Sequence, residues 1–299
     1  MSGSRIDVPL TPMSALTPPR IVRRAVPGDA FLPAELHAVT RRVLAARGIT
    51  APAALDTSLK GLLPASELGG CAAAVSLIAQ VMGEGGHILV VGDFDADGAT
   101  STALALRALR AMGAPDVGYL VPNRFEYGYG LTPEIVDLAA QRQPSLIITV
   151  DNGISSIDGV ARARGYGIRV LITDHHLPGA TRPLANAIVN PNLPDDNFPS
   201  KCLAGVGVIF YVMSALRTHL REQGWFSARG IVEPNLATLL DLVALGTVAD
   251  MMPLLGENRS LVQRGLARLN APQRVGVETL LTVAICARAP SMPRPSAFA

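Results

Sequence analysis

The sequence predicts an α/β protein with a parallel, doubly wound, Rossmann-like sheet, preceded by a helical preface and followed by linking helices. From residue 87 onward, short apolar runs alternate with amphipathic segments, which is the rhythm of βαβ units. The runs are uninterrupted and β-branched, as expected of strands buried on both faces of a parallel sheet. Acidic residues and histidines follow directly after several runs, where open α/β sheets place their ligands.

The preface is predicted over residues 31–86 and holds two helices. The first covers residues 32–49 and ends near Gly48; the second covers residues 68–83 and is closed by the Gly85-Gly86 pair. Proline and glycine break the segment between them. Residues 1–30, which are rich in Pro, Ser and Arg, are expected to form a disordered or loosely docked tail.

The sheet domain is predicted over residues 87–255. A helix is expected directly after the first strand, with Thr100 or Ser101 as its cap. Linking helices are expected over residues 256–286, and residues 287–299 are expected to form a second disordered tail. The expected strands lie at residues 88–91, 117–122, 145–151, 168–173 and 187–190, and the further helices at 133–142, 155–165, 205–221, 235–249 and 256–269.

Composition narrows the class of protein. Hydrophobic residues make up 49% of the 299 residues and charged residues 17%, which indicates a well-buried globular protein. The net charge is +2, so any nucleic-acid contact must come from local basic patches. The three cysteines form no CxxC pair, which favours neither a disulfide framework nor a zinc site and fits a reducing cytoplasm. No signal peptide or membrane-spanning run is apparent.

The first strand is followed by a dense acidic cluster, Asp93, Asp95 and Asp97, and then by Gly98. If this segment is extended, alternation points the three carboxylates to one side, where they repel one another unless a cation binds. Such hard oxygen donors suit Mg²⁺ or Mn²⁺. Two alternatives stay open at this point: a polar loop with capping aspartates, and the DxDGT-like box of haloacid-dehalogenase-type phosphatases.

Two other predicted strands are followed directly by residues that can bind metal or catalyse a reaction. Asp151-Asn152-Gly153 follows one, and Asp174-His175-His176 follows the next. Alone, the first is typical of a turn and the second of a solvated loop. Because parallel strands end at one edge, we expect all three groups to face a common crevice. Several carboxylates and two imidazoles gathered there indicate a metal site.

The motifs DFDADG, VDNG and TDHH, in this order, resemble motifs I to III of the DHH phosphoesterase superfamily, and the haloacid-dehalogenase interpretation has no use for the Asp-His-His group. Over about residues 35–280 the chain further resembles the RecJ family of single-strand-specific exonucleases. The segments that carry this likeness are Arg47-Gly48-Ile49, Gly128-Tyr129-Gly130-Leu131, Asn190-Pro191-Asn192, LAGVGV at 203–208, DLVALGTVAD at 241–250 and Glu257-Asn258-Arg259.

The resemblance implies a 5′-to-3′ exonuclease of DNA repair and recombination that acts on single-stranded DNA with two Mn²⁺ or Mg²⁺ ions. Single-strand-binding protein and a helicase are the implied partners. Asp151 would bridge the ions, Asp95 would belong mainly to one, and Asp97, His175 and Asp250 to the other. The implied metal ligands are Asp93, Asp95, Asp97, Asp151, His175 and Asp250, of which all but Asp93 are also implied as catalytic together with His176.

Further roles follow from the resemblance. His176 would lie beside the scissile phosphate, and Asp174 would orient an imidazole. Arg124 and Arg259 would neutralise substrate phosphates, although Arg124 by itself also fits a surface salt bridge. By itself Asp250 would be only a polar helix end. Tyr127 and Tyr129 suit either base stacking or core packing.

The chain departs from the family towards its end. The DHHA1 and OB-fold parts of RecJ proteins are not recognisable, so we expect a fragment that binds metal but has weak or absent processive nuclease activity. An exposed apolar face is expected where DHHA1 would pack. Two other functions remain open: a small-substrate phosphodiesterase acting on oligonucleotides or cyclic dinucleotides, and a non-catalytic domain that binds only metal or a partner.

Overall fold

The structure is a computed structural model that describes residues 22, 25, 27–28, 31–49 and 51–286. The predicted tail at 287–299, and most of the one at 1–30, lie outside the described residues. The chain divides into two compact units, Met1–Leu55 and Asp56–Ala299, so the predicted preface spans parts of both.

The first unit contains α1 (Ala38–Ala46) and the 3₁₀ turn η1 (Pro52–Leu55). Helix α1 is shorter than the predicted 32–49. It begins after His37, whose Nδ1 accepts a hydrogen bond from Val39 N at 3.2 Å, and turns precede it around Pro33. A side-chain acceptor at the cap and a proline upstream both favour this later start.

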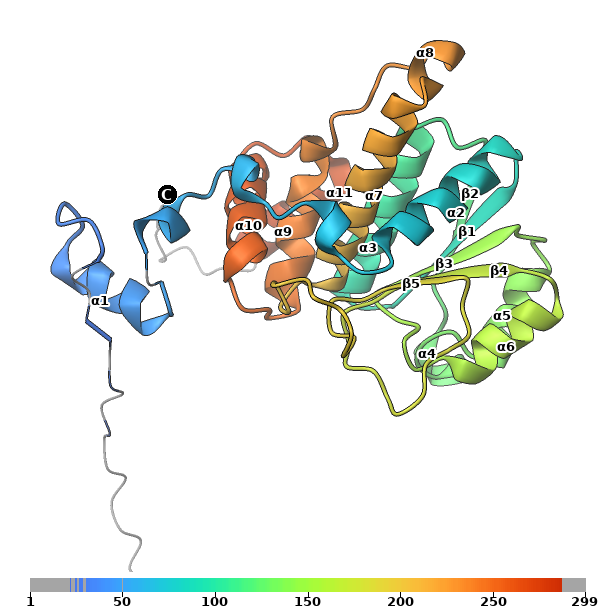
Figure 1. Cartoon of the computed structure of the whole chain (residues 1–299), viewed down its shortest axis with the longest axis horizontal. Coiled ribbons are helices and arrows are strands. Elements are labelled where there is room, and N and C mark those ends of the chain that lie inside the picture. Colours follow the sequence, from blue (N-terminus) through green and yellow to red (C-terminus); the bar gives the residue numbers. More distant parts are fainter. Residues whose placement is uncertain (1–21, 23–24, 26, 29–30, 50, 287–299) are drawn as a thin grey trace, which may run out of the picture. The chain divides into compact units, whose positions relative to one another are not determined.

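The second unit is built on a five-stranded sheet in the order β2-β1-β3-β4-β5, and every neighbouring pair is parallel. This confirms the predicted fold class. Figure 1 shows the strands side by side with helices on both faces. The strands are β1 (His87–Gly92), β2 (Asp116–Leu120), β3 (Leu146–Val150), β4 (Arg169–Thr173) and β5 (Ala187–Val189).

Each face of the sheet has its own hydrophobic core. One core packs α2 (Cys71–Gly83), α3 (Ala96–Ala111) and α7 (Gly205–Glu222) against side chains such as Val90. The other packs α5 (Pro133–Ala140) and α6 (Ile157–Gly165) against Leu89 and Val91. Successive residues of β1 therefore serve opposite faces, which explains why the strand is continuously apolar.

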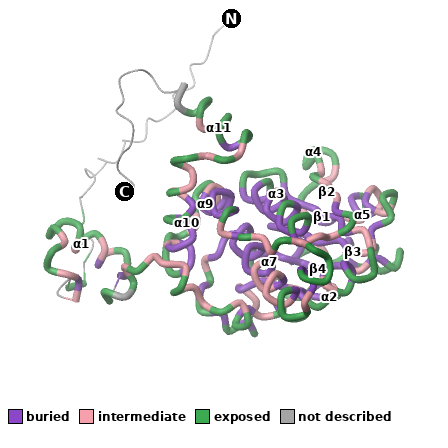
Figure 2. Tube along the Cα trace, turned by 90° about the horizontal axis from the view of Figure 1, so that it is seen from above, coloured by how far each residue is buried: buried purple, intermediate pink, exposed green. Residues whose placement is uncertain are grey.

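Further helices follow the sheet: α8 (Trp225–Arg229), α9 (Leu240–Ala249), α10 (Gly256–Leu269) and α11 (Val275–Cys286). Helix α9 packs against α3, α7 and α10. Figure 2 shows largely buried strands, whereas much of α11 is exposed, including Val275, Leu280 and Val283. Short elements complete the unit: η2 (Leu59–Gly61), η3 (Ala65–Glu67), α4 (Arg124–Tyr127) and η4 (Leu236–Leu239).

The described helices were compared with the length and hydropathy that a membrane-spanning helix requires. Among the described residues, no single helix is both long and apolar enough to cross a bilayer. One pair bent by 81°, Leu59–Glu67 with Cys71–Gly83, meets the length and composition criteria together, but Ala74 and Ile78 of this pair are fully buried in the core.

Candidate metal centre

The three motif-bearing strands end at the same level. Gly92 of β1 pairs with Val150 of β3, and Val150 pairs with Thr173 of β4. The next residues are Asp93, Asp151 and Asp174, so three carboxylates leave adjacent strands in register. The chain leaves β1 towards β2 and later continues from β3 away from it, so β1 and β3 flank the point where the strand order reverses. This is where parallel α/β sheets form their ligand crevice.

The acidic cluster after β1 is not extended throughout, as the sequence pattern suggested. Helix α3 begins at Ala96, and Asp95 is its cap, with Oδ1 accepting from Gly98 N at 2.8 Å. The expected cap at Thr100 or Ser101 is therefore wrong, because the carboxylate satisfies a free helix N–H one turn earlier. Asp97 thus lies in the first helical turn, and strand alternation does not explain its direction.

Asp97 is held by a second helix. Its side chain is 1% exposed, Oδ2 accepts from Gly205 N at 2.7 Å, and Oδ1 accepts from Val206 N at 2.9 Å, both at the start of α7. Helix N-termini favour such anions. Burial, together with the neighbouring charge of Asp151, nevertheless raises the pKa of Asp97 to about 7.

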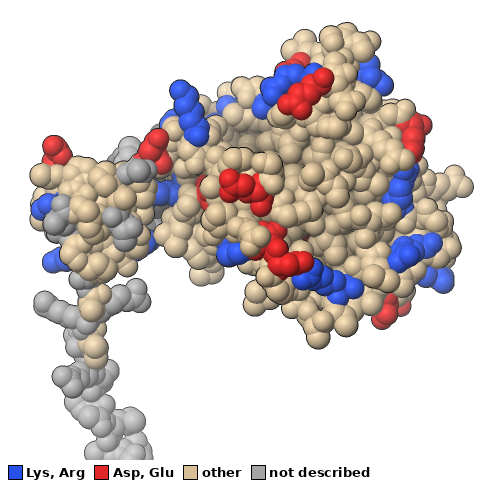
Figure 3. All heavy atoms as spheres, in the orientation of Figure 1, with Lys and Arg blue, Asp and Glu red and all other residues tan. Residues whose placement is uncertain are grey.

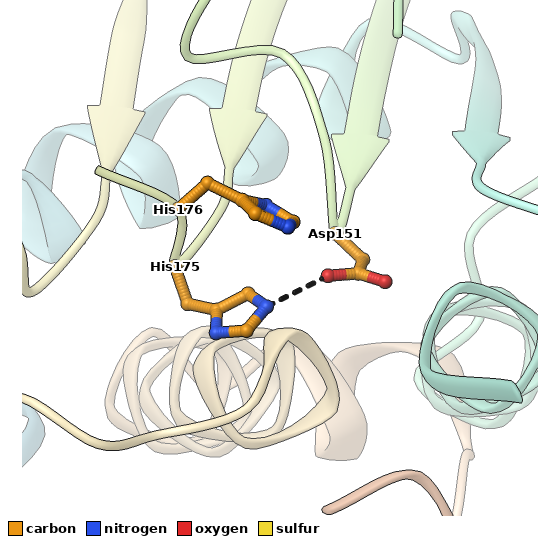
Figure 4. Close-up of side chains that lie close together, drawn as sticks. All are labelled: Asp151, His175 and His176. Atoms are coloured by element: carbon orange, nitrogen blue, oxygen red, sulfur yellow. Dashed lines mark ion pairs between the residues drawn. The ribbon is translucent and has the colours of Figure 1, made fainter. Parts of the chain in front are cut away.

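Asp151 and His175 form the centre of the cluster. Figure 4 shows them pointing towards each other from the ends of β3 and β4, with His176 also directed towards Asp151. His175 Nε2 lies 3.0 Å from Asp151 Oδ1, 3.6 Å from Asp250 Oδ2 and 3.9 Å from Asp97 Oδ2. Asp151 adopts φ of 61°, a left-handed conformation that is unusual outside glycine and is often found at functional sites.

The donor set fits divalent ions. His175 Nε2 and Asp151 Oδ1 are buried and, among the described residues, neither has a hydrogen-bond partner. Their separation of 3.0 Å is about that between adjacent ligands of an octahedral ion with bonds of ~2.1 Å. Three groups place their ligand atoms within 4.8 Å of one another: Asp151, His175 and His176; Asp97, His175 and Asp250; Asp93, Asp95 and Asp151. All six predicted metal ligands are therefore brought together.

His176 and Asp174 form a hydrogen-bonded pair beside this cluster. Asp174 Oδ1 lies 2.7 Å from His176 Nδ1, and its Oδ2 accepts from Ile154 N at 2.8 Å. The hydrogen bond to Asp174 raises the pKa of His176 to about 9. Burial alone would raise the pKa of Asp174, but its hydrogen bonds, above all that from His176, outweigh burial and lower it.

Two asparagines support the histidines and were not assigned a role from the sequence. Asn190 Nδ2 donates to His176 O at 2.8 Å, and Asn192 Nδ2 donates to His175 O. The only sequence signal was the Asn190-Pro191-Asn192 motif, which indicated family membership rather than this contact.

The predicted substrate-contacting residues differ in position. The Arg124 guanidinium lies 3.8 Å from the ring centroid of Phe94, whose side chain is exposed, and its charge acts on Asp93. Tyr129 Oη donates to Asp151 O at 3.2 Å, whereas Tyr127 packs against the core. For Arg259, the described residues provide no hydrogen bond or ion pair to the cluster, and its buried Nε has no hydrogen-bond partner.

Metal affinity should depend strongly on pH. Burial raises the pKa of Asp151 to about 9, so its carboxyl group is protonated at neutral pH in the metal-free protein. An ion must displace that proton, so affinity rises with pH. We expect the dissociation constant for Mn²⁺ to fall about 30-fold between pH 6 and 7.5, one factor of ten per pH unit for one released proton. Calorimetric titration at both pH values checks this, and a pH-independent affinity would contradict it.

The family model described as "DHH family, N-terminal domain" matches residues 87–247, more than half of the chain. The chain belongs to the DHH family. It is also 58% identical over 263 residues to the single-stranded-DNA-specific exonuclease RecJ of Escherichia coli (strain K12), covering 88% of this chain and 46% of that protein. The Thermus thermophilus RecJ is 38% identical over 234 residues, covering 78% of this chain and 32% of that one.

Solved structures agree with this DHH-family assignment. A crystal structure of exonuclease RecJ bound to manganese matches with a TM-score of 0.62 and 37% identity, covering 74% of this chain and 52% of that one. A crystal structure of the Thermus thermophilus RecJ in complex with Mn²⁺ gives the same TM-score at 35% identity, covering 79% and 32%. The predicted likeness to RecJ is confirmed. This chain spans about half or less of the length of these relatives.

Proposed function

We propose that this DHH-family chain hydrolyses phosphodiester bonds of single-stranded DNA with two Mn²⁺ or Mg²⁺ ions. The observation that carries the proposal is the buried 3.0 Å contact between His175 Nε2 and Asp151 Oδ1, atoms for which the described residues provide no hydrogen-bond partner. Four further carboxylates surround this contact. The RecJ relatives support the substrate, and the manganese- and magnesium-bound RecJ structures support the metal.

The chain's residues divide the work. Asp93, Asp95 and Asp151 form one ligand group and Asp97, His175 and Asp250 another, joined through Asp151 and His175. When bound, the divalent ions supply an activated water and offset negative charge on the reacting phosphate. The carboxylates and His175 would hold these ions at the edge of the sheet.

His176 is placed to contact the substrate. Its side chain is 47% exposed, and its Nδ1 is taken by Asp174, which leaves Nε2 available. Because its pKa is raised to about 9, His176 is protonated at neutral pH and can donate to a phosphate oxygen. Arg124 and the exposed ring of Phe94 lie next to the acidic cluster and suit a phosphate and a stacked base.

Contact with DNA depends on such local groups. On the face drawn in Figure 3, Lys and Arg lie in small groups among Asp and Glu, and uncharged residues cover most of the surface. The low charged fraction of 17% fits this picture. Several parts of the proposal rest on the resemblance alone: the 5′-to-3′ direction, the role in repair and recombination, the single-strand-binding and helicase partners, and Arg259 as a phosphate contact. The cytoplasmic location rests on the cysteine pattern of the sequence.

The test is digestion of an end-labelled single strand by the purified chain, with Mn²⁺ and with EDTA, beside a dinucleotide substrate. We expect product only with the metal. Cleavage of the dinucleotide but not of the strand would instead favour a small-substrate phosphodiesterase. Bound Mn²⁺ without cleavage of either would favour a non-catalytic metal-binding domain.

In the same assay, Asp174→Asn should reduce hydrolysis about 10–100-fold, because it removes the charge that orients and protonates His176. The pH optimum should also move to lower pH as the pKa of His176 falls. Asp137→Asn is the matched control, since Asp137 is an exposed carboxylate paired with Arg162 on the face covered by α5 and α6. Equal rates for both variants would contradict the role of Asp174.

A further inference from the structure

A cavity of about 390 Å³ lies at the end of α3 opposite to the acidic cluster. Its walls come from Arg107, Arg110 and Ala111 of α3, from residues 234–236 and 238–239, and from Arg274 before α11. Thirteen residues separate Asp97 from Arg110 along one helix, which at 1.5 Å per residue is about 20 Å. The cavity is therefore separate from the metal centre.

Three arginines line this cavity, and its lining within the described part of the chain includes no carboxylate. The side chain of Arg274 is 12% exposed; it forms an ion pair with Asp241 at 3.3 Å and donates to Thr238 O at 2.6 Å. These two contacts fix the guanidinium at the cavity wall. Burial lowers the pKa of Arg274, and the nearby charges of Arg107 and Arg268 lower it further, while Asp241 opposes them.

The carboxylate next to the cavity, Asp241, is already engaged by other groups of the protein. Asp241 is 2% exposed and its Oδ1 accepts from Leu242 N at 3.0 Å, so it does not reach into the cavity as a free anion. Arg110 uses one N–H to donate to Val117 O at 3.0 Å. The exposed side chain of Arg107 has no hydrogen bond or ion pair within the described part of the chain. Positive charge therefore exceeds negative charge here, and N–H donors remain unused.

We propose that this cavity is a second, non-catalytic site that binds a phosphate group. Guanidinium groups present planar pairs of N–H donors that match phosphate oxygens, and they bind phosphate more strongly than neutral donors do. Asn235 and Thr238 add polar atoms, and Leu236 and Leu239 add an apolar wall. The phosphate comes either from the backbone of a DNA strand or from a small phosphate ester, and the chemistry of the site is the same for both.

The first measurement is a titration of the full chain with inorganic phosphate, followed by the NMR signals of the arginine Nε–H groups. We expect saturable shifts in wild type. Arg107→Gln should weaken binding at least about fivefold, because it removes an exposed, unpaired cation without disturbing the core. Arg42→Gln on α1 is the matched control, since it removes the same charge from another exposed helix position.

The second measurement distinguishes the two sources. Binding of a labelled thymidine 12-mer is followed by fluorescence anisotropy in EDTA, where the acidic cluster holds no ion and repels phosphate. A DNA strand as the source predicts weaker binding by Arg107→Gln and a salt slope smaller by about 0.7. If phosphate or a nucleoside monophosphate binds but the 12-mer does not, the cavity is a phosphate site whose ligand is a small ester. Equal binding of all ligands by Arg107→Gln and Arg42→Gln would overturn the proposal. Because hydrolysis is not measured, the result is independent of the proposed nuclease activity.

Discussion

Asp151→Asn should abolish metal-dependent hydrolysis. Asp151 belongs to two of the three ligand groups and contacts His175 of the third, so its loss weakens both proposed metal positions at once. Mutation of residues that only support a metal ligand typically lowers activity about 10–100-fold. We expect the loss for Asp151→Asn to exceed that range, down to the background of the assay. The control is Asp116→Asn, whose exposed carboxylate lies at the start of the edge strand β2.

The same variant should not unfold the protein. The pKa of Asp151 is raised from 3.8 to about 9 by burial, so the folded state holds a proton that the unfolded state releases above pH 4. The stability contribution of this group is therefore complete below about pH 4 and is lost as the pH rises towards 9. Asparagine does not ionise, so metal-free Asp151→Asn should be at least as stable as wild type at pH 8.

Calorimetry separates the two effects. Wild type should gain thermal stability when Mn²⁺ is added, because the ion binds only the folded state. Asp151→Asn should lose this gain while keeping its own unfolding transition. If the variant keeps both hydrolysis and Mn²⁺-dependent stabilisation, Asp151 is not a ligand of the metal site.

Gly205→Ala should disrupt the centre without touching a ligand. A Cβ at Gly205 would lie 2.7 Å from both Cβ and Oδ1 of Asp151, closer than real Cβ contacts allow. Neither backbone can easily yield, because Gly205 N donates to Asp97 and Asp151 holds a left-handed conformation. We expect about 1–3 kcal/mol lower stability, as for other overpacked sites. Hydrolysis should fall more than about 100-fold, because small displacements of reacting groups have effects of that size.

The matched control is Gly276→Ala on α11. Nothing lies within 4 Å of a Cβ at that position, and alanine favours helices over glycine by about 1 kcal/mol. Urea unfolding, Mn²⁺ titration and hydrolysis should therefore leave Gly276→Ala at or above wild type while Gly205→Ala fails in all three. Wild-type behaviour of Gly205→Ala would show that α7 can retreat from Asp151, and the close packing would then have no role.

The correct predictions and the wrong ones can both be traced to local features of the chain. The strands were predictable because apolar runs such as 146–150 must be buried on both faces, and the motifs were predictable because they follow those runs directly. The predicted direction of the Asp97 side chain was wrong because strand alternation ends at Asp95, whose carboxylate caps the start of a helix. Tyr127 and Tyr129 could not be separated by sequence, since two residues apart one packs in the core and the other reaches Asp151.

The sequence by itself determined the parallel sheet, its helical layers and the set of acidic and histidine residues at the strand ends, because backbone periodicity and burial act over a few residues. Only the tertiary structure decided that Asp250 lies 3.6 Å from His175, that the first residues of α7 donate to Asp97, and that Arg107 and Arg274 share one cavity. These contacts join segments 75, 108 and 167 residues apart. They depend on how α7 and α9 pack against α3, which no local pattern along the chain encodes.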